Sequence, residues 1–247
     1  GRYHTCALLD DASVKCWGGN GYGQLGLGDN NARGDGPNEM GDNLTVVALG
    51  AGRTAEGLAA GYRHTCALLD NGHVKCWGVN GKGQLGLGNT ATRGIDPGQM
   101  GDFLPAVALG VGRTAVGITA GRYHTCALLD DASVKCWGGN GYGQLGLGDN
   151  NARGDGPNEM GDNLTVVALG AGRTAEGLAA GYRHTCALLD NGHVKCWGVN
   201  GKGQLGLGNT ATRGIDPGQM GDFLPAVALG VGRTAVGITA GRYHTCA

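Results

Sequence analysis

The stretch HTCALLDDASVKCWGGNGYGQLGLG runs from His4 to Gly28 and carries the features that decide the fold. It contains two cysteines, a tryptophan directly after the second cysteine, and then a run in which glycine takes nearly every second or third place. Such a stretch could form a binding site, for example a metal clip or a phosphate loop. It could also be the framework of a repeated fold, and its recurrence along the chain distinguishes the two.

The stretch recurs because the whole chain of 247 residues is a repeat. Residues 61–120 repeat residues 1–60 with substitutions. Residues 121–180 then copy 1–60 letter for letter, 181–240 copy 61–120, and 241–247 start a further unit. A fixed period of this size is typical of a solenoid, a propeller or an array, in which each unit buries its apolar face against its neighbours. We therefore divide the chain into four blade units and the start of another.

Each unit contains four short segments with the composition of strands. They are HTCALLD, HVKCWG (His73–Gly78), TVVAL (Thr45–Leu49) and EGLAA (Glu56–Ala60). Between the first two lies a turn with Asn71 and Gly72, a strong hairpin signal because both residue types tolerate positive φ. Four strands per 60-residue unit fit one blade of a β-propeller, whereas the coils of a β-solenoid are usually shorter.

The composition supports a turn-rich β protein and excludes several other classes. The chain has 53 glycines, and glycine disfavours long helices. Its formal net charge of −1 argues against a nucleic-acid partner. No apolar run approaches the ~18 residues of a membrane helix. The absence of an initiator methionine and of a signal-peptide pattern indicates a mature product or a fragment.

The spaced elements of each unit resemble the repeat of the regulator of chromosome condensation family. They are a glycine, then HTCAL, VKCWG, an asparagine such as Asn20, and GQLGLG, in the same order four times. The resemblance implies an all-β propeller, commonly with seven blades, so four units would be part of a larger ring or array. It also implies an elaborated blade loop at Asp29–Asn43. Nucleotide exchange on a small nuclear GTPase is known in this family, but the paired cysteines and near-perfect repetition here do not favour it.

Eight cysteines form four pairs with one spacing. The pairs are Cys6 with Cys16, Cys66 with Cys76, Cys126 with Cys136, and Cys186 with Cys196. If the hairpin sets Cys6 opposite Cys16, their Cα atoms lie about 4.5–5.5 Å apart, which a disulfide can span. Zinc held by His4, Cys6 and Cys16 is the alternative, but no fourth ligand is evident, so we favour disulfides. Secreted bacterial members of the resembled family are similar in their paired cysteines, so we expect an extracellular or periplasmic location.

Two other sets of residues could carry chemistry. A histidine recurs at His4, His64, His124, His184 and His244. No partner carboxylate or nucleophile recurs with it, so we favour a buried histidine that bonds backbone between blades.

The second set is acidic and lies in the long loop of the first unit, at Asp29, Asp35, Glu39 and Asp42. It could bind calcium, but the EF-hand spacing fails, since Arg33 occupies a ligand position. We favour a solvated loop.

We expect a protein without enzymatic activity and without a cofactor or metal. The only serines, Ser13 and Ser133, lie in predicted turns without a nucleophile-elbow motif. The loops at the blade rims would make the chain an extracellular scaffold for a protein or glycan. The alternative is a structural protein that assembles with other copies of itself, or with further repeats of the same array, into a larger ring or filament.

Overall fold

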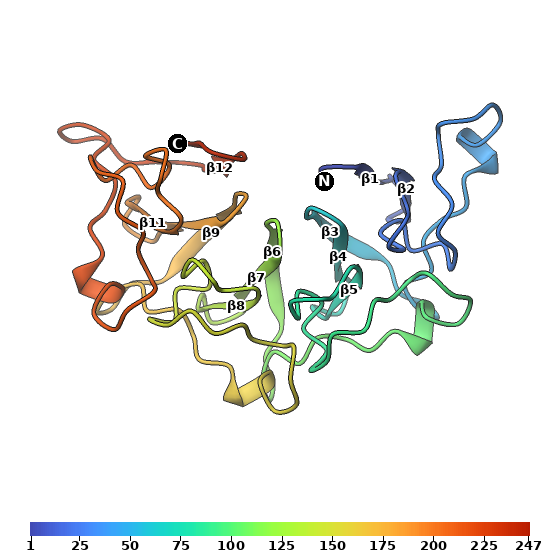
Figure 1. Cartoon of the computed structure of the whole chain (residues 1–247), viewed down its shortest axis with the longest axis horizontal. Helices are drawn as coiled ribbons and strands as arrows, with labels where there is room; N and C mark the ends of the chain where they lie inside the picture. The colour runs from blue at the N-terminus through green and yellow to red at the C-terminus, as the bar shows by residue number, and fades with distance from the viewer.

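The computed structural model describes all 247 residues, and the chain bends into an open arc of small β-sheets with both termini at its mouth (Figure 1). The first sheet consists of β1 (His4–Leu8) and β2 (Val14–Gly18), and the last of β12 (Thr239–Ala240) and β13 (Thr245–Cys246). Three complete antiparallel sheets lie between them: β3 (Ala55–Ala60), β4 (His64–Leu69) and β5 (Val74–Gly78); β6 (Ala115–Ala120), β7 (His124–Leu129) and β8 (Val134–Gly138); β9 (Ala175–Ala180), β10 (His184–Leu189) and β11 (Val194–Gly198).

The predicted all-β architecture of repeated blades is confirmed. Each complete sheet takes its first strand from the end of one sequence unit and its other two from the start of the next. The only helices are four short 3-10 turns, η1 (Gly41–Asn43), η2 (Gly101–Phe103), η3 (Gly161–Asn163) and η4 (Gly221–Phe223). None of them has the length and apolar character that a bilayer crossing requires.

The predicted hairpin register is also confirmed. Cys6 pairs with Cys16 and Leu8 with Val14 on β1 and β2, and the same register recurs in every complete blade. In the turn before β5, Gly72 has a φ of 72°. The corresponding residue of the other unit type is an alanine, and Ala132 adopts a φ of 61°, which L-residues with a Cβ rarely adopt.

The prediction of a fourth strand at Thr45–Leu49 is wrong. Val47 and Leu49 are buried while Val46 is exposed, so the segment has the alternating burial of a strand. Its backbone, however, forms no ladder with another strand. The Val47 N–H donates to the Val14 carbonyl at 2.8 Å, and the Ala48 carbonyl accepts a hydrogen bond from the Gly101 N–H of the following blade. A blade therefore has three regular strands, plus an isolated bridge such as that between Gly78 and Arg93.

The hydrophobic core lies between blades rather than within them. One cluster of 12 buried residues joins Val74 and Leu85 of one blade to Leu129 and Trp137 of the next. Corresponding clusters of 11 and 13 residues lie at the other two complete junctions, whereas the cluster at the C-terminal end has only 5. Each blade thus needs its neighbour to complete its core.

Candidate functional site

The structure joins each predicted cysteine pair by a disulfide. The bonds are Cys6–Cys16, Cys66–Cys76, Cys126–Cys136 and Cys186–Cys196, each with Cα atoms 4.1 Å apart. Cys246 is free and exposed. The zinc alternative is wrong for the first unit, because both sulfurs are bonded to each other and His4 Nε2 lies 2.8 Å from Thr65 Oγ1. These cysteines crosslink the hairpin between the two strands that carry them.

The recurring histidine lies buried between blades, but its partner is a side chain and not the backbone that we expected. The Thr125 hydroxyl donates to the carbonyl of Gln84 at 2.9 Å, and His64 Nε2 lies 3.0 Å from the same hydroxyl. Since a hydroxyl has one proton to donate, Nε2 must carry the proton of the His64 ring. Burial lowers the pKa of His64 and His124 to about 3. The histidines are therefore neutral links between blades.

Two of the four acidic residues of the first long loop, Asp29 and Glu39, bind groups of the loop itself, and the four do not form a metal-binding group. Asp29 accepts a hydrogen bond from Arg33 at 2.6 Å, and Glu39 accepts from the N–H groups of Gly34 and Gly36 at 2.8 and 2.9 Å. The Gly36 N–H, ahead of the others, holds the pKa of Glu39 below its usual value. No group of three or more histidine, cysteine or acidic side chains has the geometry of a metal site.

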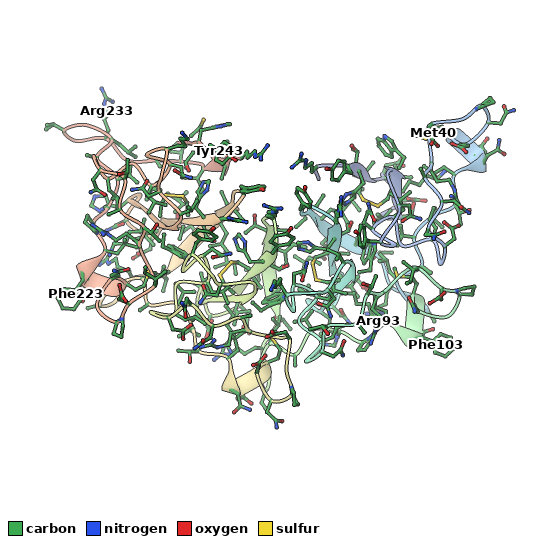
Figure 2. The ribbon with its side chains drawn as sticks, in the orientation of Figure 1. Met40, Arg93, Phe103, Phe223, Arg233 and Tyr243 are labelled. Carbon is green, nitrogen blue, oxygen red and sulfur yellow. A yellow bond between two sulfur atoms is a disulfide. The ribbon has the colours of Figure 1, made fainter.

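A feature that sequence reasoning missed lies on the concave edge of the arc, directly before the strands that begin with histidine. Two residues at this place alternate between Arg-Tyr and Tyr-Arg from unit to unit. We call these ten residues the inner rim: Arg2, Tyr62, Arg122, Tyr182 and Arg242 in one row, and Tyr3, Arg63, Tyr123, Arg183 and Tyr243 in the other. Figure 2 shows Tyr243 beside the opening of the arc, whereas Phe103 and Phe223 lie on its outer perimeter.

In the first row, arginine and tyrosine alternate from blade to blade and stack on one another. The Arg122 guanidinium carbon lies 4.8 Å from the ring centre of Tyr62 and 4.5 Å from that of Tyr182, and Arg122 also donates to the Tyr182 hydroxyl. Arg2 lies 4.9 Å over Tyr62, and Arg242 lies 4.8 Å over Tyr182. These are cation–π distances, so one stacked row follows the whole concave edge.

The first row lines a cavity of about 320 Å³. The rest of the lining consists of alanines and glycines, such as Ala120 and Gly121, and no acidic residue is present. In the second row, Arg63 lies 4.7 Å over the ring of Tyr22, and Arg183 lies 4.5 Å over the ring of Tyr142. The rim therefore presents guanidinium groups held by aromatic rings around an open space.

The arginines of the inner rim differ in their partners from five of the eight other arginines of the chain. Five arginines elsewhere each pair with an aspartate: Arg33, Arg53, Arg113, Arg153 and Arg173. None of the five rim arginines forms a salt bridge, and Nε of Arg122 is buried without a hydrogen-bond partner. Guanidinium groups bind carboxylates and phosphates with paired hydrogen bonds. The rim thus has the chemistry to hold an anionic group.

Curated relatives match most of this chain but only part of their own length. Probable E3 ubiquitin-protein ligase HERC4 of Homo sapiens is 32% identical over 215 residues, which are 86% of this chain and 18% of that protein. Ultraviolet-B receptor UVR8 of Arabidopsis thaliana is 30% identical over 216 residues, which are 86% of this chain and 43% of that protein. The chain therefore spans less than half the length of these relatives.

Solved structures share the fold over nearly the entire chain. Human WBSCR16 superimposes with a TM-score of 0.70 at 20% identity, covering 99% of this chain and 55% of that one. Yeast RCC1 (Prp20), in its complex with Kap60, gives 0.69 at 19% identity, covering 99% and 51%. Two family models described as Regulator of chromosome condensation (RCC1) repeat match the chain. One matches residues 1–24, 57–84, 115–144 and 177–204, and the other matches residues 71–128 and 191–247. The chain belongs to the RCC1 repeat family.

Proposed function

We propose that this chain is a binding scaffold whose inner rim holds an acidic segment of a partner protein. The observation that carries the proposal is the set of five rim arginines, which stack on tyrosines and pair with no carboxylate of their own chain. RCC1-repeat proteins form propeller scaffolds for protein binding, and yeast RCC1 (Prp20) was solved bound to Kap60.

The stacking favours an acidic polypeptide over a neutral glycan. A neutral sugar binds aromatic side chains through their open faces, but the rim guanidinium groups already lie over the rings of Tyr62 and Tyr182. The stack also fixes each guanidinium in place, so less side-chain entropy is lost when a carboxylate binds. One arginine of the two rows comes from each successive unit, which suits a ligand that follows the concave edge.

We propose an extracellular or periplasmic location and a role in binding rather than catalysis. Four disulfides support the location, because such bonds persist in oxidising compartments. Ser13 and Ser133, the only serines, lie in hairpin turns, where their recorded hydrogen bonds go to Asp11 and Asp131 and none to a histidine, which supports the role.

The test uses a fluorescent poly-glutamate peptide as the probe and polarisation as the readout. We expect the wild-type chain to bind it at low salt and to lose affinity as salt rises, because exposed charges are screened. Arg122→Gln should weaken binding about tenfold or more, since a charged hydrogen bond contributes about 1.5–3 kcal/mol. The matched control is Arg233→Gln, which removes the same charge at the outer tip of the C-terminal end (Figure 2). Equal losses in both variants, or equal binding of poly-glutamine, would contradict the proposal.

A second candidate function is self-assembly of the chain into a larger ring or filament. Its support is the exact repeat with a period of 120 residues, which gives successive two-unit steps the same junction surfaces.

A further inference from the structure

Two asparagines on the outer perimeter of the arc begin the sequence pattern Asn-Leu-Thr. They are Asn43, followed by Leu44 and Thr45, and Asn163 at the same place of the third unit. No other asparagine of the chain has a serine or threonine two residues further on. An asparagine followed by any residue except proline and then by threonine is the acceptor pattern for N-linked glycans on surface loops of secreted proteins. The sequence thus offers two places for a covalent modification.

The backbone around Asn43 directs the asparagine and the threonine to solvent together. Asn43 is the last residue of η1, and the chain then becomes extended, with Leu44 at a φ of −79° and a ψ of 112°. In an extended chain, successive side chains point to opposite sides. Leu44 is 2% exposed, whereas Asn43 and Thr45 are both exposed. The buried leucine therefore anchors the turn, and the two reactive groups of the motif face outward.

The third unit repeats this arrangement at the end of η3. Leu164 is 1% exposed, and Asn163 and Thr165 are both exposed. In neither unit does the side chain of the asparagine or of the threonine form a hydrogen bond within the chain. Figure 1 shows η1 (blue) and η3 (gold) on the outside of the arc. Both side-chain amides are therefore free to take a substituent.

The other unit type shows that this position tolerates a large group. The same place holds Phe103, Leu104 and Pro105, and Leu104 is again only 1% exposed. Phe103 is 78% exposed and Phe223 is 77% exposed. The side chain before the buried leucine thus extends into solvent in all four units, and the turn forms whether that side chain is small or large.

Open space adjoins the motif of the third unit on both sides. Asn163 lines a groove of about 460 Å³ between two blades, together with polar side chains such as Asn158 and Arg93. Thr165 lines a second groove, of about 330 Å³, whose lining includes the exposed Phe223. The first sugars of a glycan would find polar partners for their hydroxyls in one groove and an aromatic face for their C–H groups in the other.

We propose that Asn43 and Asn163 carry N-linked oligosaccharides. The proposal rests on the extracellular or periplasmic location proposed above, and the donor is an oligosaccharide attached to a lipid diphosphate. The Nδ2 atom of the asparagine bonds to the anomeric carbon of the first sugar, and the bond from that carbon to the diphosphate oxygen breaks. The diphosphate leaves with the bonding electron pair, and one amide proton passes to a base of the transferase. Nothing is oxidised or reduced.

The glycans and the inner rim lie on opposite sides of the arc. Met40, which directly precedes η1, lies at the outside of one end, whereas Tyr243 of the rim lies beside the opening (Figure 2). A glycan on Asn43 or Asn163 therefore extends away from the rim arginines and leaves them open to an acidic partner. Modification and binding are compatible in one molecule.

The test is mass spectrometry of the full chain secreted from insect cells, which supply the lipid-linked donor. We expect a glycan at each of the two sites, and peptide N-glycosidase should convert both asparagines to aspartate. Asn43→Gln and Asn163→Gln should each lose one glycan. Thr45→Ala should lose the glycan of Asn43 although the asparagine remains, and Thr45→Ser should keep it, because the serine restores the hydroxyl. A glycan on Asn43 in Thr45→Ala would contradict the motif.

A gain of modification tests the position itself. The double substitution of Phe103→Asn and Pro105→Thr reproduces the Asn-Leu-Thr motif in the second unit, around the buried Leu104. We expect this variant to carry a third glycan, because the new asparagine has the same exposed place in the fold. Asn38 is exposed but lies outside the motif, and it should stay unmodified in every variant. A double variant without the third glycan would contradict the role of the position.

The remaining outcomes separate this inference from the proposals before it. A secreted wild-type chain with four disulfides but no sugar on Asn43 or Asn163 overturns the inference and leaves the location standing. A secreted chain whose cysteines stay reduced contradicts both the location and the inference. Glycans at both sites in a chain that does not bind poly-glutamate support the inference and contradict the rim function alone.

Discussion

An interior junction and the two ends of the arc contain the same residues in different surroundings. Trp137 is fully buried, while Trp17, in an identical stretch of sequence, is half-buried. Gly86 lies under an indole ring, while Gly206 lies open. The difference teaches that a blade of this chain does not have a core of its own. Its side chains become a core only when the next blade covers them.

The largest expected contrast is between two identical tryptophan substitutions. Trp137→Ala should lower the free energy of unfolding by about 3–5 kcal/mol, because it opens a cavity in a packed junction. Trp17→Ala should change it by less than about 1 kcal/mol at a concentration where the chain is monomeric, since surface changes have small effects. Urea denaturation of both variants measures the contrast. Equal losses would mean that the junction is not where stability resides.

Removal of a disulfide should have a similar effect at both places. Each bond closes a loop with a sequence separation of 10, which corresponds to about 3 kcal/mol in the chain-entropy model. We expect the double substitution of Cys126 and Cys136 by alanine to lower the free energy of unfolding by that amount, and by a further amount because buried packing is lost. The same change at Cys6 and Cys16 should lower the free energy of unfolding by the same loop-closure contribution, but it should remove less packing. Denaturation midpoints that fall further for the end pair would contradict this order.

The threonine that receives the histidine provides a third matched pair. Thr125→Val leaves the buried Nε2–H of His64 without an acceptor and should cost about 1–3 kcal/mol. Thr5→Val should cost almost nothing, because Thr5 is exposed and its hydroxyl has no partner within the chain. Thermal unfolding of the two variants, side by side, checks this. A Thr5 variant as unstable as the Thr125 variant would show that β-propensity, rather than the hydrogen bond, governs the site.

Acid should weaken the junction that contains His124 over a wider pH range than the first junction, which contains His4. An unfolded histidine has a pKa near 6.5, but burial lowers the pKa of His124 to about 3 and that of His4 to about 4. Stability is therefore complete above pH ~6.5 and falls as the pH drops toward the folded pKa, by about 1.4 kcal/mol per pH unit for each histidine. His124→Gln should flatten this slope down to pH ~3, and His4→Gln only down to pH ~4. Unchanged slopes in both variants would contradict the assignment.

The smallest expected effect concerns the hairpin turn, where the two unit types differ. Ala132 adopts a φ of 61°, which glycine adopts without strain. Ala132→Gly should therefore raise stability slightly, by less than about 1 kcal/mol, since the added freedom of the unfolded chain opposes the gain. Gly72→Ala should lower it, because the new Cβ would lie 2.6 Å from the Thr114 Cβ. Differential scanning calorimetry measures the opposite changes in stability of the two variants. An Ala132→Gly variant less stable than wild type would show that the backbone of Ala132 is not strained.

The repeat, the hairpin register and the cysteine pairing could be predicted because each depends on local sequence. Asn71 and Gly72 set the turn, and the register then places Cys66 opposite Cys76. The segment Thr45–Leu49 could not be predicted correctly, because alternating burial does not reveal which backbone groups are paired. The histidine could be assigned to a junction, but not to Thr125, whose position depends on how one blade packs on the next.

The inner rim escaped prediction for a related reason. Arg122 and Tyr182 are a full unit apart in sequence and meet only because the arc brings successive blades together. The available signal was the alternation of Arg-Tyr and Tyr-Arg before the buried histidine. It indicates a contact only once that histidine is known to lie between blades.

The dependence of each blade on its neighbour is tested most directly by hydrogen–deuterium exchange of the full chain. The amides of β7 and β8, inside the arc, serve as the internal reference. We expect β1, β2 and β12 to exchange faster than the reference, because a neighbouring blade covers each end sheet on one side only. End strands as protected as β7 and β8 would show that a blade is stable alone and would contradict the dependence of each blade on its neighbour.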